Sequence, residues 1–273
     1  MKLFYSKILL FGEYGIIKNS KGLAIPYNFY KGTLKTLAEV EAESDQKRED
    51  AHKSNEALKD FASHLQTLTN EANPIVRFNI EKLNADIADG MYFDSSIPQG
   101  YGVGSSGALV AAIYSEYAID PIDAIDDLTR EKLLQLKAIF GRMESFFHGT
   151  SSGLDPLNSY LSLPILINSY DNIEPTGIPT QTPDGKGAVF LLDSGIIGET
   201  APMVHIFMEN MKNEAFQKML KEEFIKYTDA CIDDFLKGRF KSLFGNIKSL
   251  SSIVLNHFKP MIPKEIHTLW KQG

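Results

Sequence analysis

The sequence predicts an α+β protein with two domains, and three observations lead to this prediction. A chain of 273 residues suits one large domain or two modest ones. The chain opens as a strand, a turn and a second strand, and from Pro202 onward its pattern is helical nearly to the end. A stretch rich in Pro, Gly and Thr over 175–187 is typical of a linker. We therefore expect domains over 1–184 and 185–273.

The composition is that of an ordinary globular protein. Hydrophobic residues make up 43% and charged residues 23% of the chain, which excludes a collagenous or wholly disordered protein. The formal net charge is -7, so we expect neither nucleic acid nor a membrane surface as a partner. A single cysteine, Cys231, allows no internal disulfide and no Cys-based zinc site, and it fits a cytoplasmic location. The apolar run 3–11 is too short and too polar for a membrane span.

The first half of the chain alternates strands and helices. Residues 3–11 are rich in strand formers, and a second short strand over 22–26 should end at its proline. The highly charged segment 41–53 predicts a solvated helix or a mobile insertion. Apolar spacing predicts a helix over 54–69, and alternation predicts a half-buried strand over 74–80.

A glycine-rich loop then opens a helix. Four glycines between Gly100 and Gly107 precede good helix formers, and an amphipathic helix follows over 133–147. The segment 151–156 has the composition of a tight turn. Further along we predict strands at 163–167 and 188–193 and helices near 202–220, 222–236, 240–257 and 263–271.

Glycine-rich loops before helices bind phosphate, because the backbone can approach closely and the first helical N–H groups attract anions. A Walker A loop is excluded, since no lysine occurs between Leu83 and Lys132. Residues 102–107 satisfy the Rossmann pattern, but Pro98 stands where the leading strand should end. A purely structural turn is the remaining alternative.

Three further positions have both a plain and a functional interpretation. Glu144 and His148 lie four apart on the amphipathic helix, as a surface pair or around a half-buried carboxylate. The Asp155 side chain could hydrogen-bond to the backbone of its own turn, or it could be a catalytic carboxylate. Lys7 could simply face solvent from its strand, although Glu13 follows nearby. The residues alone leave these alternatives open.

Taken together, three blocks of this sequence resemble the GHMP kinase superfamily. Residues 7–14 are similar to its K-x-x-L-x-G-E-H opening, and residues 97–108 look like its P-x-G-x-G-L-G-S-S-A-A phosphate loop. Residues 144–155 are similar to the E-x-x-x-H-G-x-x-S-G-x-D segment of the mevalonate kinases, the members that this chain resembles most. Residues 193–200 resemble the loop in which those enzymes keep a substrate-contacting threonine.

The resemblance implies a fold, namely a ribosomal S5 domain 2-like N-terminal domain and a ferredoxin-like C-terminal domain. It also implies ATP and Mg²⁺ as cofactors. The residues that it places around the ATP phosphates are Gly100, Gly102, Gly104, Ser105, Ser106 and Gly107. Ser106 and Glu144 would hold Mg²⁺, Asp155 would accept the proton of the attacking alcohol, and Lys7 would stabilise Asp155 and the transferred group. Glu13 and Thr200 are the expected substrate contacts.

The implied activity is phosphorylation of a small primary alcohol, with mevalonate converted to mevalonate 5-phosphate in isoprenoid precursor synthesis. Phosphomevalonate kinase or another GHMP small-molecule kinase is the enzyme alternative. Few cations stand in the three blocks to receive a substrate that is already phosphorylated. A catalytically silent nucleotide-binding protein is the alternative from another class. A homodimer is left open.

Two departures from the family pattern matter. Tyr14 replaces the usual histidine of the opening block, which loosens the match to any one substrate. The final G-x-G-G-G loop of the family does not occur before Gly273. On this basis we expect an incomplete second domain, apolar helix faces after residue 202 and weak or absent activity.

Overall fold

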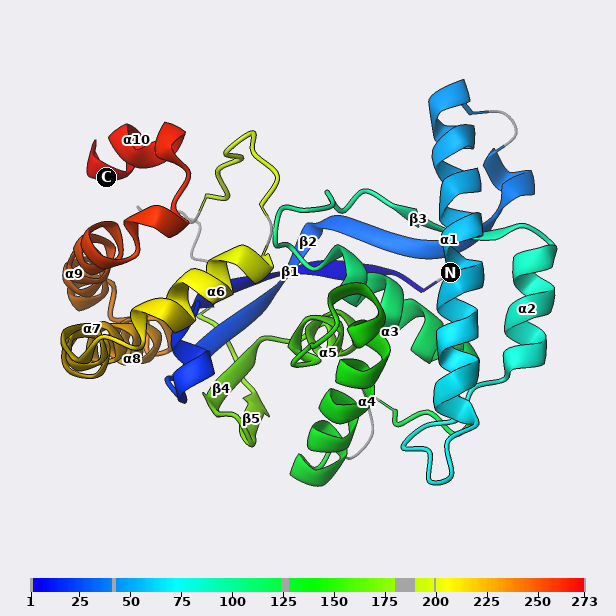
Figure 1. Ribbon diagram of the computed structural model, residues 1–273, viewed down its shortest axis with the longest axis horizontal. Coiled ribbons are helices and arrows are strands. Elements are labelled where there is room, and N and C mark those ends of the chain that lie inside the picture. The colour runs from blue at the N-terminus through cyan, green and yellow to red at the C-terminus, as the bar shows by residue number, and fades with distance from the viewer. Residues whose placement is uncertain (1, 41–42, 124–127, 180–189, 199, 273) are drawn as a thin grey trace. The chain divides into compact units, whose positions relative to one another are not determined.

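A computed structural model describes residues 2–40, 43–123, 128–179, 190–198 and 200–272 of the chain. Within these residues the strands form one five-stranded sheet with the order β1-β2-β4-β5, in which β3 also pairs with β2 (Figure 1). The strands are β1 (Phe4–Phe11), β2 (Gly22–Thr36), β3 (Met91–Ser95), β4 (Ile165–Ser169) and β5 (Asn172–Pro175). The mixture of strands and helices confirms the predicted α+β class.

Helices make up most of the remaining structure. The α-helices are α1 (Asp45–Thr69), α2 (Ile80–Ala88), α3 (Ser105–Tyr117), α4 (Arg130–His148), α5 (Leu154–Leu161), α6 (Thr200–Asn210), α7 (Glu214–Met219), α8 (Ile225–Leu236), α9 (Phe240–His257) and α10 (His267–Gln272). Short 3₁₀ turns occur at Gly15–Lys18, Leu37–Val40, Lys259–Met261 and Lys264–Ile266, and a π-helical turn at Leu220–Phe224.

The chain forms two compact units. The first unit consists of residues 1–8, 26–99 and 103–163, and the second of residues 9–25, 100–102 and 164–273. Each unit therefore draws on separate stretches of the chain, because β1, β2 and the glycine-rich loop pass from one into the other. The domain boundary expected after residue 184 stays a prediction.

Strand β2 is longer than the sequence predicts. It continues through Pro26 to Thr36, so the predicted end at this proline is wrong. Residues 22–24 pair with β4, and residues 32–36 pair with β3. Pro26 lies between these two stretches, where neither partner strand needs the N–H group that proline lacks.

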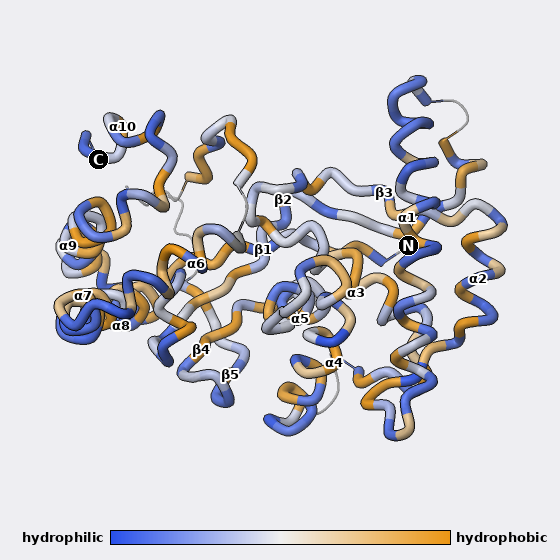
Figure 2. The backbone as a smooth tube through the Cα atoms, viewed as in Figure 1, coloured by the Kyte–Doolittle hydropathy of each residue, from blue (hydrophilic) through white to orange (hydrophobic). Residues whose placement is uncertain are grey.

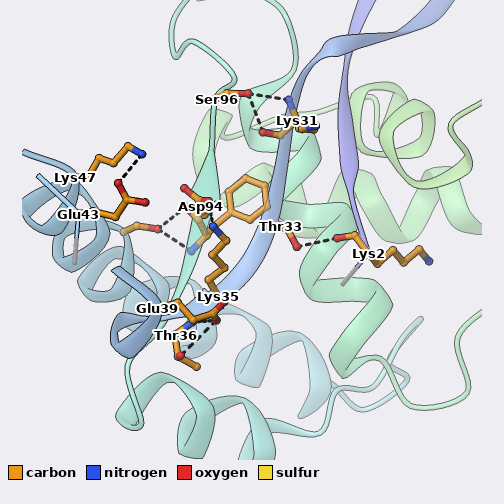
Figure 3. Close-up of polar contacts among 12 residues, drawn as sticks. Lys2, Lys31, Thr33, Lys35, Thr36, Glu39, Glu43, Lys47, Asp94 and Ser96 are labelled. Carbon is orange, nitrogen blue, oxygen red and sulfur yellow. Dashed lines mark hydrogen bonds and ion pairs between the residues drawn. The ribbon is translucent and has the colours of Figure 1, made fainter. Parts of the chain in front are cut away.

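Side-chain contacts join β2 to β3 and to the turn that follows β2 (Figure 3). Lys35 Nζ lies 2.7 Å from Asp94 Oδ2, and the backbone N–H of Lys31 donates to Ser96 Oγ at 3.0 Å. At the end of β2, the backbone N–H of Thr36 donates to the Glu39 carboxylate at 3.0 Å. These contacts are exposed, so each adds little to the free energy of unfolding.

Helix α1 includes the charged segment for which the sequence predicts a helix or an insertion. It begins after Ser44, whose side chain accepts a hydrogen bond from the N–H of Lys47. Polar and apolar residues alternate along it (Figure 2), and its apolar stripe is buried at Leu58, Phe61, Leu65 and Leu68. The helix predicted over 54–69 is confirmed as its second half.

The strand predicted over 74–80 is wrong. Phe78 alone forms an isolated bridge, with Ala118, and the Asn79 side chain caps α2 by accepting from the N–H of Lys82. Val76 and Phe78 are buried nonetheless, so the alternation reflects a loop in which these side chains pack on the core. The cap at Asn79 ends that segment too early for a strand.

The core of the first unit lies around α3. Ala108, Val110, Ala111 and Ile113 are fully buried, and α4 and α5 pack beside this helix (Figure 1). Three rings join the helices, with centroids 5.0 Å apart for Tyr114 and Phe140, 5.2 Å for Tyr114 and Tyr160 and 5.5 Å for Phe140 and Tyr160. Such aromatic contacts hold α3, α4 and α5 in a fixed arrangement.

The second unit is built around a different aromatic cluster. Its buried members are Phe207, Met219, Leu220, Phe224, Ile253 and Phe258. Helices cover most of 200–272, as the sequence predicts, and α9 leaves Phe240 and Phe244 exposed. No helix in the described part of the chain has the length and apolarity needed to cross a membrane.

The strand predicted over 188–193 is wrong for the residues that can be compared. Residues 190–193 form coil, Phe190 is 86% exposed, and residues 188 and 189 lie outside the described part, as does most of the predicted linker. An apolar run becomes a strand only beside a partner strand, and the described residues after Pro175 contain none. The ferredoxin-like sheet and its incompleteness stay predictions.

Candidate active site

Lys7 and Asp155 form an ion pair in the first unit. Lys7 Nζ lies 3.0 Å from Asp155 Oδ1, and the Lys7 side chain is only 11% exposed. The backbone N–H of Lys7 donates to the Val103 carbonyl at 3.0 Å, which ties β1 to the glycine-rich loop. Lys7 therefore does not take the solvent-facing position that its strand would also allow.

The register of α5 on β1 brings this pair together. Ser159 Oγ donates to the Tyr5 carbonyl at 2.7 Å. Asp155 and Ser159 are four apart on a helix and Tyr5 and Lys7 two apart on a strand, and both spacings keep residues on one face. The helix therefore lies along the strand with Asp155 at Lys7 and Ser159 at Tyr5.

The tight turn predicted over 151–156 is shorter than expected. Helix α5 begins at Leu154, with Gly153 as its N-cap at φ 72°, so Asp155 belongs to the first helical turn. Pro156 does not prevent this, because a proline in the first turn lacks only an N–H that has no intrahelical acceptor. Asp155 is therefore held by a helix.

Glu144 is a buried carboxylate at the end of α4. Its side chain accepts hydrogen bonds from Ser106 Oγ at 3.0 Å and from Ser151 Oγ at 2.5 Å, and the residue is 4% exposed. Burial above all, and then the Asp155 charge, raise the pKa of Glu144 to about 7, against the opposing effect of both serines and Lys7. The interpretation of Glu144 and His148 as a plain surface pair is wrong.

Ser151 reaches Glu144 because its loop lies directly on α4. A Cβ at Gly153 would come within 2.1 Å of the Lys137 carbonyl oxygen, and one at Gly141 within 3.1 Å of the Ser151 carbonyl oxygen. Glycine is therefore needed at Gly153, and a side chain at Gly141 would be tight against the loop. The backbone N–H of Gly153 also donates to Ser151 Oγ at 3.0 Å.

The glycine-rich loop opens α3 as predicted. Gly104 is the N-cap at φ 80°, with no side-chain cap, so the first N–H groups of α3 are not covered by a capping side chain. A Cβ at Gly104 would lie 3.0 Å from Lys7 Cγ, whereas one at Gly102 would meet nothing within 4 Å. The Rossmann interpretation is excluded, because β3 before the loop runs antiparallel to β2.

The start of the loop belongs to the second unit. The backbone N–H of Gly198 donates to the Gly100 carbonyl at 2.8 Å, and a Cβ at Gly100 would lie 2.4 Å from Ile197 Cγ2. The positive φ angles of Gly100 and Gly102, 78° and 69°, suit glycine. The phosphate-binding role of Gly100, Gly102, Gly104, Ser105, Ser106 and Gly107 stays a prediction.

The two residues expected to contact substrate also lie in the second unit. Glu13 is exposed in the turn after β1, where its carbonyl accepts from the N–H of Gly15 at 2.7 Å. Tyr14 adopts φ 60° and stacks on Phe207 and Phe258 at centroid distances of 5.7 and 6.1 Å. Thr200 begins α6, and its side chain lies outside the described part.

Sequence reasoning missed the part that Ser151 plays and the partner of His148. His148 Nε2 lies 3.0 Å from Ser106 Oγ, so the imidazole meets Glu144 only through this serine. Ser151 lies seven residues after Glu144, and this spacing in the sequence does not indicate that its hydroxyl contacts the carboxylate. Among the described residues, no group of three or more His, Cys, Asp and Glu side chains could hold a metal.

Comparison with known proteins finds a family match for one segment of the chain. Residues 65–162 match the family model "GHMP kinases N terminal domain", and this range contains Ser106, Glu144 and Asp155. No curated protein sequence matches the chain.

Two solved structures are similar to this chain. A mevalonate kinase structure is 14% identical with a TM-score of 0.51, over 98% of this chain and 82% of that one. The Methanococcus jannaschii mevalonate kinase is 15% identical with a TM-score of 0.49, over 93% of this chain and 79% of that one. The first likeness shows a shared fold. Residues 65–162 of the chain are therefore similar to the N-terminal domain of the GHMP kinases, and the chain shares its fold with a mevalonate kinase structure.

Proposed function

We propose that this chain is an ATP-dependent kinase of a small primary alcohol, and that the alcohol is mevalonate. The observation that carries the proposal is the ion pair of Lys7 and Asp155 in the same unit as the Ser106 and Glu144 pair. One pair can handle the proton of an alcohol, and the other offers oxygen ligands for a cation. Phosphoryl transfer needs chiefly positioning and charge stabilisation, which such groups supply.

The residues fit Mg²⁺. Ser106 and Glu144 offer hard oxygen donors 3.0 Å apart, and the carboxylate is buried among hydroxyls. Mg²⁺ favours oxygen ligands and keeps several waters, so one or two protein ligands suffice beside phosphates. When bound, Mg²⁺ offsets the charge of the nucleotide phosphates, which a chain of net charge -7 does poorly.

The start of α3 fits the phosphates themselves. Its first turn has no side-chain cap, and the N–H groups there carry the positive end of the helix dipole. Gly104 lets the backbone turn at φ 80° immediately before this helix. Ser105, Ser106 and Gly107 then present their N–H groups to the nucleotide.

Asp155 accepts the proton of the attacking hydroxyl or orients it. Lys7 holds this carboxylate in place, because its ammonium lies 3.0 Å from Asp155 Oδ1. The same ammonium stabilises negative charge on the transferred group. General bases of this kind contribute about 100-fold to 10,000-fold to a rate.

The choice of mevalonate rests on the block 144–155, which is most similar to that of the mevalonate kinases. A phosphorylated acceptor would need further cations, because an uncompensated buried dianion is costly. Arg142, a basic residue two positions before this block, is engaged on the surface by Glu71. This supports an acceptor without phosphate.

The test compares ADP release with mevalonate, phosphomevalonate, galactose and homoserine as acceptors. We expect the highest kcat/KM with mevalonate and a turnover about 100-fold lower, or lower still, for D155N. A higher kcat/KM for any other acceptor contradicts the substrate. ATP binding without turnover on any acceptor supports the silent binding protein instead.

A further inference from the structure

The Ser106 hydroxyl lies between two side chains of α4. Its Oγ is 3.0 Å from Glu144 Oε1 and 3.0 Å from His148 Nε2. A serine hydroxyl has one proton to donate and two lone pairs to accept with. The direction of each hydrogen bond therefore depends on the other.

When Glu144 is ionised and no cation is bound, the directions of both hydrogen bonds are set. An ionised carboxylate only accepts, so Ser106 donates its proton to Oε1. The other oxygen is served in the same way, because the N–H of Gly153 donates to Ser151 Oγ, which donates to Glu144 Oε2. With its proton used, Ser106 can only accept from His148, whose Nε2 must then carry a hydrogen.

A cation bound by Ser106 and Glu144 cannot leave this pattern in place. Both oxygens must turn a lone pair toward the ion, and the proton between them then points at a positive charge. The proton needs another acceptor within hydrogen-bond distance of Ser106 Oγ. His148 Nε2 at 3.0 Å is such an acceptor once the imidazole hydrogen is on Nδ1.

We propose that His148 is a positioning residue, whose Nε2 accepts a hydrogen bond from the Ser106 hydroxyl when a divalent cation occupies Ser106 and Glu144. This rests on the proposed function, since it assumes the cation site. The imidazole suits the task because its two tautomers make the same nitrogen a donor without the ion and an acceptor with it. His148 therefore acts on the cation through Ser106 and does not touch it.

Because of its position, His148 can be replaced to test its proposed role without disturbing the fold. The residue is exposed at the last turn of α4, outside the buried stripe of that helix. Replacing it should change the hydrogen bond to Ser106 and leave the core intact. Outer partners of metal ligands typically contribute about 10-fold to 100-fold to metal affinity.

The experiment uses Mn²⁺ as the probe, with its dissociation constant in the presence of ADP measured by electron paramagnetic resonance. The variants are H148L, which can neither accept nor donate, and H148Q, whose amide can do both. His52, an exposed histidine of α1, gives the matched control H52L. The KM for Mg²⁺ and the melting temperature are recorded for each variant.

We expect H148L to weaken Mn²⁺ binding by about 10-fold or more and to raise the KM for Mg²⁺ with an unchanged melting temperature. H148Q should recover most of the affinity, and H52L should behave as the wild type. Wild-type affinity in H148L, or no recovery in H148Q, overturns the role of His148 alone. A wild-type protein that binds no Mn²⁺ with ADP overturns the cation site of the proposed function, and this inference with it.

Discussion

Gly107 packs against Asp155 so closely that no side chain fits between them. A Cβ at Gly107 would lie 2.8 Å from the carbonyl carbon of Asp155 and 2.8 Å from the nitrogen of Pro156. Both are backbone atoms, which cannot rotate away as a flexible side chain can. This glycine therefore sets how near α3, which carries Ser106, comes to α5, which carries Asp155.

G107A should separate α3 from α5. Overpacking of this kind costs about 1 to 3 kcal/mol in the free energy of unfolding, which urea denaturation measures. G245A is the matched control, since Gly245 lies in α9 and its Cβ would meet nothing within 4 Å. There alanine should stabilise by roughly 0.5 to 1 kcal/mol. Equal effects of the two changes would contradict the close packing at Gly107.

D155N should reduce kcat by about 100-fold or more, because asparagine cannot accept the hydroxyl proton. The affinity for ATP should stay near that of the wild type, as measured by calorimetry. D94N removes a carboxylate from an exposed ion pair with Lys35 and should leave kcat unchanged. Full activity of D155N would remove Asp155 from the mechanism.

The Lys7 and Asp155 pair should be coupled more strongly than an exposed pair. Lys7 is 11% and Asp155 35% exposed at the side chain, against 31% and 46% for Lys35 and Asp94. A double-mutant cycle with K7M and D155N should give about 1 kcal/mol of coupling in unfolding experiments. The cycle with K35M and D94N should give about 0 to 0.5 kcal/mol. A reversed order would contradict the partial burial of the first pair.

E144Q should be more stable than the wild type at pH 8. The pKa of Glu144 is raised to about 7, so between its ordinary value and pH 7 the folded chain binds more protons than the unfolded one. The stabilisation from this group is complete at low pH and is lost as the pH rises through 7. Glutamine carries no charge, and the gain at pH 8 should reach up to about 3 kcal/mol.

Urea denaturation of both proteins at pH 5 and pH 8 measures this difference. At pH 5 the two stabilities should nearly coincide. E56Q changes an exposed glutamate of α1 and should keep the wild-type dependence on pH. A difference between E144Q and wild type that is the same at both values would contradict the raised pKa.

Elements with a long periodic pattern could be predicted, and those set by distant partners could not. The apolar stripes of α1 and α4 are visible in sequence because a helix shows its buried face at a spacing of three and four residues. The continuation of β2 past Pro26 depends on β3 and β4, which come much later in the chain. The apolar run at 190–193 has strand composition, and it forms coil for lack of a partner strand among the described residues.

The candidate site shows the same division. The residue types at Lys7, Ser106, Glu144 and Asp155 were suggested by motifs, and the structure pairs Lys7 with Asp155 and Ser106 with Glu144. The burial of Glu144, which raises its pKa, depends on the loop 151–153, which packs closely on α4 at Lys137 and Gly141. The position of Ser151 follows from that packing too. No pattern along the chain reports such a contact between backbones.

The contact between β1 and α5 also has a consequence for biosynthesis. Ser159 donates to the Tyr5 carbonyl across a separation of 154 residues in the chain. Lys7 and Asp155 are separated by almost as many residues. At about 5 to 20 residues per second, a ribosome needs on the order of ten seconds to deliver α5 after β1 has emerged. Until then the apolar first strand lacks this neighbour and is open to chaperones or to other nascent chains. The ion pair of the site is thus among the last contacts that the newly made first unit can close.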